Sequence, residues 1–148
     1  MIQDEWIHNL LLRRPDLQPE ALARTAVLMN EAIEDSLIEN FEHLIDSMTL
    51  PDPGDRHVLA AAVASQSDAI VTFNIKDFAS VPGVDVWHPD DFLVSRYAYD
   101  AIGTLNSISA LRQRLKNPPK TAHQLIATYE RQGLPLFSRF LQKKIDLI

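Results

Sequence analysis

Apolar residues recur at helical spacing near the start of the chain. Those within residues 2–13 share one broad face, so an amphipathic helix is predicted there, ending before Pro15. A second helix is predicted from Pro19 to Ile33, because its apolar residues also fall on one face. That face carries Leu22, Ala26, Met29 and Ile33. Residues 37–38 favour a short strand, and residues 41–48 favour a helix or a turn.

The pattern of the stretch Leu50–Phe78 changes from helix to strand. Asp52–Asp55 contains Pro and Gly, which supply turn geometry, and Asp suits the start of a helix. Apolar residues then return at helical spacing over Val58–Val63. The apolar, β-rich run Ala69–Phe73 predicts a buried parallel strand. The predicted order is therefore loop, helix, turn, strand and loop.

The rest of the chain is predicted to be mainly helical. Residues 117–119 interrupt the apolar pattern with two prolines, and Thr121 with Gln124 forms a capping box that starts the next helix. His88, just before a proline, is expected to cap or pack rather than to bind a ligand. The predicted elements are a loop at 79–83, an edge strand at 84–87, a helix that starts within 88–93, a long helix from Arg96 to about Lys116, a helix from Thr121 to Arg131, and a final helix over 136–147.

Composition limits the class of protein. The chain has 148 residues and is 46% hydrophobic, which suits one domain, or one domain with an appendage. It has no cysteine, so disulfides and thiolate metal sites are excluded, and a reducing cytoplasmic location is expected. No apolar run approaches the roughly 20 residues of a membrane span. The acidic and then basic start does not resemble a signal peptide.

Charge is distributed unevenly along the chain. The net charge is −6, but residues 1–95 carry −12 and residues 96–148 carry +6. A basic segment of this kind suggests a polyanion or an acidic surface as its partner. It could equally lie against the acidic part of its own chain. Residues 1–95 are taken as one domain and residues 96–148 as a basic helical extension.

Two acids stand at positions that favour ligand binding. Asp55 lies at a predicted helix start, and Asp77 lies just past the carboxyl end of the predicted strand, the edge where open α/β sheets bind ligands. Carboxylates gathered there repel one another unless a cation lies between them, and ligands that are all oxygen favour Mg²⁺ or Mn²⁺. The alternative is a helix cap and a solvated loop acid.

The two motifs resemble the second half of a PIN domain, and most closely the VapC-type toxin ribonucleases. The first motif is Asp55 followed by Val58-Leu-Ala-Ala-Ala, and the second is Ile70-Val-Thr-Phe-Asn-Ile-Lys-Asp-Phe. They occur in the family's order and at its separation. The resemblance covers about residues 1–95, and the tail resembles the helical extension of one VapC subgroup. It implies an α/β, PIN-like three-layer fold with a short parallel sheet, N-terminally truncated, and a C-terminal helical extension.

The resemblance also implies roles for individual residues. Glu5, on the first predicted helix, matches the family's early glutamate and would bind Mg²⁺ or Mn²⁺ together with Asp55 and Asp77. Asn74 would orient a carboxylate or a water. The bases expected to hold the RNA backbone are Arg56, Lys76, Arg112, Arg114 and Lys116. Glu5 could instead be a surface acid favoured by the helix dipole, and the bases could be ordinary solvated side chains.

A PIN domain starts with a central strand that ends in an aspartate, and this sequence has no match to either. Loss of a central strand exposes two hydrogen-bonding edges, and unpaired edges recruit partners. We therefore expect that the chain is not a compact monomer on its own. Another copy fills the slot, a separate polypeptide supplies a strand, or the remaining strands pair differently.

The function implied by the resemblance is metal-dependent endoribonuclease activity, as in the toxin of a type II toxin–antitoxin system, impaired by loss of the first aspartate. Its expected partners are RNA, a cognate antitoxin and further copies of the chain. One alternative is a non-catalytic PIN remnant that acts as a binding or regulatory subunit. Another is a fragment of an ordinary toxin.

Overall fold

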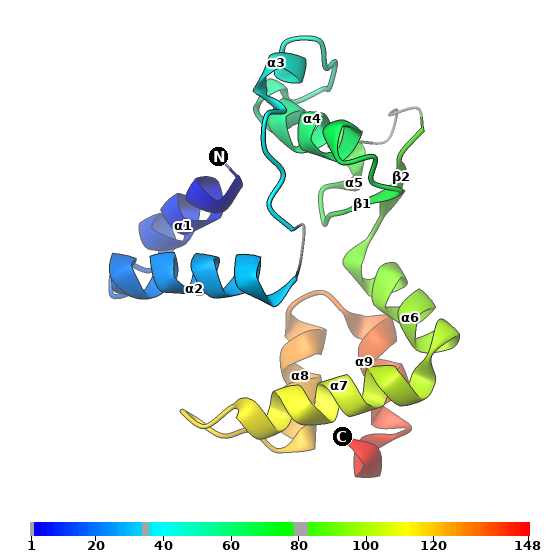
Figure 1. Ribbon diagram of the computed structural model, residues 1–148. Coiled ribbons are helices and arrows are strands. Elements are labelled where there is room, and N and C mark those ends of the chain that lie inside the picture. The colour runs from blue at the N-terminus through cyan, green and yellow to red at the C-terminus, as the bar shows by residue number, and fades with distance from the viewer. Residues whose placement is uncertain (1, 34–35, 79–82) are drawn as a thin grey trace. The chain divides into compact units, whose positions relative to one another are not determined.

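A computed structural model describes residues 2–33, 36–78 and 83–148 of the chain, in which helices dominate (Figure 1). The chain forms two compact units. The first takes in Met1–Ile70 and Lys76–Asp85, and the second takes in Val71–Ile75 and Val86–Ile148. The two units divide within the strands, whereas the division at residue 95 into a PIN-like domain and an extension stays a prediction.

A short parallel sheet runs through this division. β1 (Ala69–Val71) pairs with β2 (Asp85–Trp87). The Asp85 amide donates to the Asp68 carbonyl at 2.9 Å, and the Thr72 amide donates to the Trp87 carbonyl at 3.0 Å. The prediction of an α/β chain with a short parallel sheet and C-terminal helices is confirmed.

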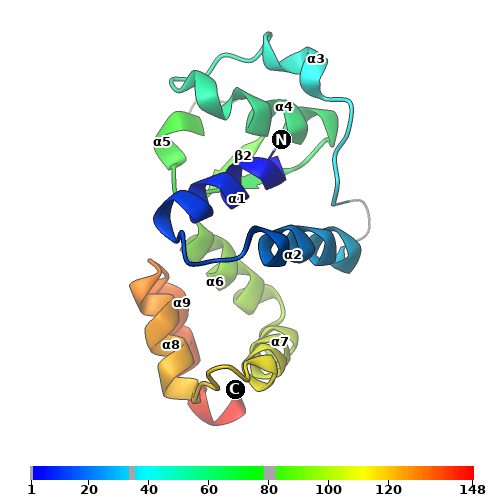
Figure 2. The same cartoon turned by 90° about the vertical axis from the view of Figure 1, so that its left-hand side faces the viewer.

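The first unit contains the helices that precede β1 in the sequence. They are α1 (Ile2–Arg13), α2 (Pro19–Ala32), α3 (Glu42–Ile45), η1 (Pro53–Asp55) and α4 (Arg56–Ala64). α1 and α2 lie side by side in both views, and Gln3 Nε2 donates to Asn30 Oδ1 at 3.0 Å between them (Figures 1 and 2). α3 packs on α4, whose small Ala60 and Ala61 side chains let Phe41 approach closely and form a buried cluster.

The second unit is a helical bundle with its own core. Its helices are α6 (Pro89–Tyr99), α7 (Ala101–Arg114), α8 (Ala122–Arg131), α9 (Pro135–Gln142) and η2 (Ile145–Leu147). α9 contacts both α6 and α8. The core is formed by Leu105, Ile126, Leu134, Phe137, Leu141 and Ile148. The predicted capping box of Thr121 and Gln124 is present, and His88 caps α6 by accepting from the Asp90 amide, as expected.

A buried carboxylate ties the first helix of this bundle to the last. Asp90 is 3% exposed, and its two oxygens accept the amides of Leu136 and Phe137, each at 2.8 Å. These amides lie in the first turn of α9, where helix N–H groups have no partner within the helix and the helix dipole favours an anion. Asp90 therefore acts as a cap supplied from a distant part of the sequence.

Five predictions of local structure are wrong. The run Ala69–Phe73 is not a buried strand throughout, because β1 ends at Val71, which is 43% exposed, and Phe73 beyond it is 60% exposed. The long helix over 96–116 is broken at Asp100, whose side chain accepts from the Gly103 amide at 2.8 Å and starts α7. The final helix over 136–147 divides into α9 and η2. Residues 37–38 form no strand. Asp77 lies in the short helix α5 (Ile75–Phe78) rather than in a loop, because the chain turns into helix soon after β1 ends.

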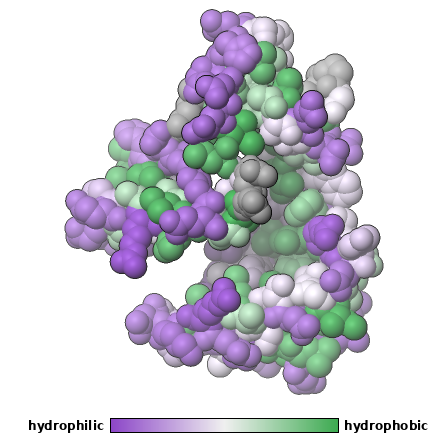
Figure 3. All heavy atoms as spheres, viewed as in Figure 1, coloured by the Kyte–Doolittle hydropathy of each residue, from purple (hydrophilic) through white to green (hydrophobic). Residues whose placement is uncertain are grey.

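The apolar face predicted for α2 is largely uncovered within the described part of the chain. Ala26 is buried, but Met29 is 50% exposed and Ile33 is 67% exposed. Apolar surface is visible among the polar groups in Figure 3. Much of the predicted loop 79–83 lies outside the described residues. None of the helices in the described ranges has the length and apolarity needed to cross a membrane.

Candidate metal centre

The turn before α4 brings two carboxylates to one place. Asp52 accepts the Gly54 amide at 2.8 Å through its side chain, and its carbonyl accepts the Asp55 amide at 3.2 Å. Pro53 and Gly54 allow this single 3₁₀ turn. Side chains three residues apart are nearly eclipsed in such a turn, so Asp52 and Asp55 project to the same side.

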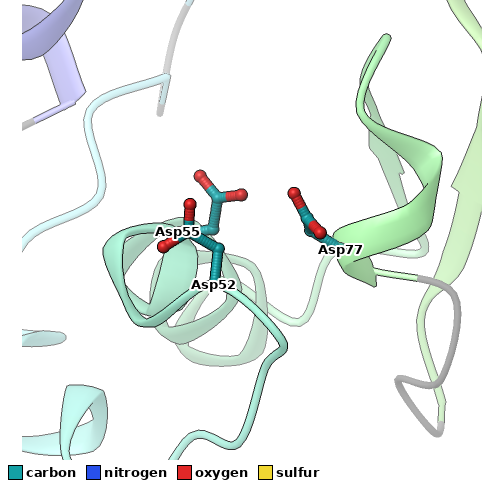
Figure 4. A group of neighbouring side chains, drawn as sticks. All are labelled: Asp52, Asp55 and Asp77. Carbon is teal, nitrogen blue, oxygen red and sulfur yellow. The ribbon is translucent and has the colours of Figure 1, made fainter.

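Asp77 brings a third carboxylate from the short helix α5. Ligand oxygens of Asp52, Asp55 and Asp77 all lie within 4.8 Å of one another. Figure 4 shows the three side chains directed into a common space, two from the turn before α4 and one from α5. We call these three residues the acidic triad. Two of its members, Asp55 and Asp77, were predicted from the sequence.

The electrostatics of the acidic triad follow from this crowding. Burial raises the pKa of Asp55 above its ordinary value of 3.8, and the negative charges of Asp52, Asp77 and Glu5 raise it further. His57 acts in the opposite direction. The ionised form of Asp55 is therefore unfavourable without a positive charge nearby.

Glu5 reaches the site from α1 through His57. Its carboxylate oxygen Oε2 lies 3.0 Å from His57 Nε2, and the ring's Nδ1 lies 2.8 Å from the Gly54 carbonyl oxygen. His57 is only 12% exposed, whereas Glu5 is 50% exposed. His57 Nε2 lacks the alignment of a hydrogen bond, so its contact with Glu5 is electrostatic. Glu5 is near enough to influence the pKa of Asp55 but is not part of the acidic triad.

The other predicted site residues are less closely tied to the acidic triad. Arg56 begins α4 directly after Asp55, and Lys76 precedes Asp77 on α5. Asn74 lies between β1 and α5, where its amide donates to Thr72 Oγ1 at 3.0 Å. Arg112 and Arg114 lie in the last turn of α7, and Lys116 lies just beyond it, all three in the second unit. The roles given to these residues stay predictions.

Asp52 is the member of the acidic triad that was not predicted from the sequence. Its residue type and its distance from Asp55 were visible, but Asp52-Pro53-Gly54 was interpreted only as a turn. The side chain does shape the turn, through its bond to Gly54, and it also faces the other two acids. A carboxylate three residues before a candidate ligand, within a Pro–Gly turn, was the signal that could have identified it.

The donor set of the acidic triad fits a hard divalent cation. It consists of carboxylate oxygens alone, the ligands that Mg²⁺ and Mn²⁺ prefer. The raised pKa of Asp55 points the same way, because a cation among the three groups would relieve their mutual repulsion.

Comparisons with known proteins found one family model and one curated relative. Residues 89–143 match the family model described as the VapC50 C-terminal domain, and this range covers α6 to α9. Over 76 residues the chain is 40% identical to a protein of Mycobacterium tuberculosis named "Putative ribonuclease VapC50". This alignment covers 49% of the chain and 45% of that relative, so the chain spans less than half of the relative's length. No solved structure matches. Both matches carry the VapC name, so over the matched residues the chain is similar to VapC-type proteins.

Proposed function

We propose that this chain acts as a metal-dependent endoribonuclease of the toxin type. The observation that carries the proposal is the acidic triad, with ligand oxygens within 4.8 Å of one another and a raised pKa at Asp55. Similarity to a relative named as a ribonuclease supports the reaction class. Phosphodiester hydrolysis needs a site of this kind, in which negative groups gather around a cation.

Asp52, Asp55 and Asp77 would hold one or two Mg²⁺ or Mn²⁺ ions, and Glu5 would complete the set. A bound ion of this type supplies Lewis acidity toward a phosphate oxygen and lowers the pKa of a water molecule. The assignment of Glu5, Asp55 and Asp77 as ligands is the one made from the sequence, and Asp52 is added because it faces the same space.

The chain's own residues would then divide the work of positioning. His57, whose Nε2 lies 3.0 Å from Glu5 Oε2, would position the Glu5 carboxylate. Asn74, between β1 and α5, would orient a carboxylate or a water. Arg56 and Lys76, each next to a member of the acidic triad, would neutralise phosphate charge on the RNA backbone.

The direct test is cleavage of a labelled RNA with Mg²⁺ or Mn²⁺ by the wild-type chain and by Asp55→Asn. We expect metal-dependent cleavage, reduced on the order of a hundredfold or more in the variant, because a group that stabilises developing charge is lost. Asp46→Asn is the matched control, since Asp46 is an exposed acid at the end of α3. Equal cleavage by all three proteins would contradict the proposal.

A non-catalytic role as a binding or regulatory subunit is the second candidate. The charge of −12 over residues 1–95 favours it, because such a surface repels RNA. This role keeps metal binding at the acidic triad but predicts no cleavage by any of the variants. The antitoxin expected for a VapC-like protein would be the partner in either case.

A further inference from the structure

The second unit has a basic pocket alongside α8, between that helix and the loop before it. Its volume is about 380 Å³. It is lined by Pro118, Pro119, Lys120, Gln124, Ala127, Thr128 and Arg131. No carboxylate is among these lining residues, and we call this site the α8 pocket. It lies outside the acidic triad, and neither Lys120 nor Arg131 was among the RNA-binding residues predicted from the sequence.

Two cations in the α8 pocket share one neutral acceptor. Lys120 Nζ donates to Thr128 Oγ1 at 2.7 Å, and Arg131 Nη2 donates to the same oxygen at 3.3 Å. Among the described residues neither cation has a carboxylate within ion-pair distance. Two positive groups that converge on one hydroxyl repel each other, and an anion between them would turn this repulsion into attraction.

A third cation supports the pocket from α7. Arg112 Nη1 lies 3.5 Å from the Lys120 carbonyl oxygen, and Arg112 Nε is buried with no hydrogen-bond partner among the described residues. The loop itself is held by the bridge between Lys116 and Pro119 and by the Thr121 capping box. These contacts hold the loop that carries Lys120 next to α8, and the pocket is positive in charge.

We propose that the α8 pocket binds a phosphate of the RNA backbone. This inference rests on the proposed function, because it takes RNA as the partner. An Arg fork and a Lys point charge on one spot suit a phosphate oxygen, and Gln124 adds a neutral side chain that can donate. Pro118, Pro119 and Ala127 give the pocket apolar walls, against which a ribose can pack. The +6 charge of residues 96–148 favours the same partner.

The experiment measures binding of a fluorescent single-stranded RNA by anisotropy, in EDTA and over a series of KCl concentrations. The test variant is Lys120→Gln with Arg131→Gln, which removes both charges but keeps polar side chains. The control is Arg139→Gln with Lys144→Gln, which removes the same charge from exposed positions of the same unit. Loss of two phosphate contacts should lower the slope of log K against log salt by about 1.4. The control should keep the wild-type slope.

A further variant, Lys120→Arg with Arg131→Lys, keeps both charges and should keep the slope, so a loss there would indicate a folding defect rather than a lost contact. An unchanged slope in the Gln variant overturns the inference, and so does an equal loss in the control pair. The assay needs no cleavage. Pocket-dependent binding without hydrolysis in Mg²⁺ would contradict only the proposed nuclease function, and hydrolysis with a pocket-independent slope would contradict only this inference.

Discussion

At the scale of single residues, ionised Asp55 destabilises the folded chain, and a bound cation would remove this destabilisation. Its pKa is raised in the folded chain, so ionised Asp55 destabilises the fold at pH values above that raised pKa. The destabilisation disappears as pH falls and Asp55 becomes protonated, since the neutral group has nothing to repel. The repulsion comes from Asp52, Asp77 and Glu5, and burial adds to it.

Asp55→Asn should therefore raise the melting temperature in EDTA at neutral pH, because it removes one charge from the acidic triad. The difference from wild type should shrink as pH falls toward 3.8, the ordinary value for Asp. With Mn²⁺ the order should reverse, since only the wild-type chain gains the free energy of binding. Thermal unfolding at several pH values, with and without metal, measures both effects. A variant that is less stable in EDTA at neutral pH would contradict this account.

His57 should matter for metal affinity although it is not a ligand. His57→Gln removes the ring whose Nε2 lies 3.0 Å from the Glu5 carboxylate, so Mn²⁺ binding should weaken by about tenfold, as is usual when a residue that orients a ligand is lost. Glu5→Gln should weaken binding too. Calorimetric titration of both single variants and the double variant gives the coupling. If the two effects simply add, His57 does not act through Glu5.

At the scale of elements, Asp90 links two helices that lie far apart in the sequence. Asp90→Asn keeps one acceptor oxygen but leaves a buried amide of α9 without its charged partner. Unfolding by urea should show a loss of about 1.5–3 kcal/mol. The neighbouring Asp91→Asn, which changes an exposed side chain, should lose less than about 1 kcal/mol. Equal losses would mean that the contact with α9 adds nothing to stability.

The predictions that the structure confirms rest on interactions between residues close together in the sequence. The capping box at Thr121 and the turn at Pro53 were visible because the partners lie within a few residues. The cap of α9 by Asp90 was not, because 46 residues separate Asp90 from Leu136. The helix break at Asp100 was missed for a different reason. The apolar period continues through it, and the side-chain bond to Gly103 outweighs that pattern.

The candidate site was predicted only in part, because only some of its features are local in the sequence. Asp55 and Asp77 were identified from a helix start and a strand end, which are local features, together with a family resemblance. The addition of Asp52 and the role of His57 depend on where the turn directs each side chain. A spacing pattern does not contain that information.

At the scale of the whole molecule, α2 leaves apolar surface exposed to solvent. Val27 and Leu28 are each 54% exposed and Met29 is 50% exposed. Contiguous apolar surface is often a site where another chain binds, and we expect this of α2. The expectation from the sequence that the chain does not act as a monomer stays a prediction.

Light scattering coupled to size exclusion should therefore give a mass above the 16.7 kDa of one chain, increasing with concentration. Val27→Gln with Leu28→Gln should shift the protein toward the monomer. The control is Arg24→Gln with Glu31→Gln, which changes exposed polar positions of the same segment and keeps the net charge. A constant mass of one chain at all concentrations would show that this surface has no partner of its own kind.

The path of the backbone between the two units limits which parts of the protein can be exchanged by recombination of gene segments. The backbone passes from one unit to the other three times, after Ile70, after Ile75 and after Asp85. A single recombination point separates two intact modules only when the backbone crosses between them once. Here a break at any one of the three crossings divides at least one of the two units. Diversification of such a protein should therefore proceed by substitution within the two units rather than by exchange of one unit for another.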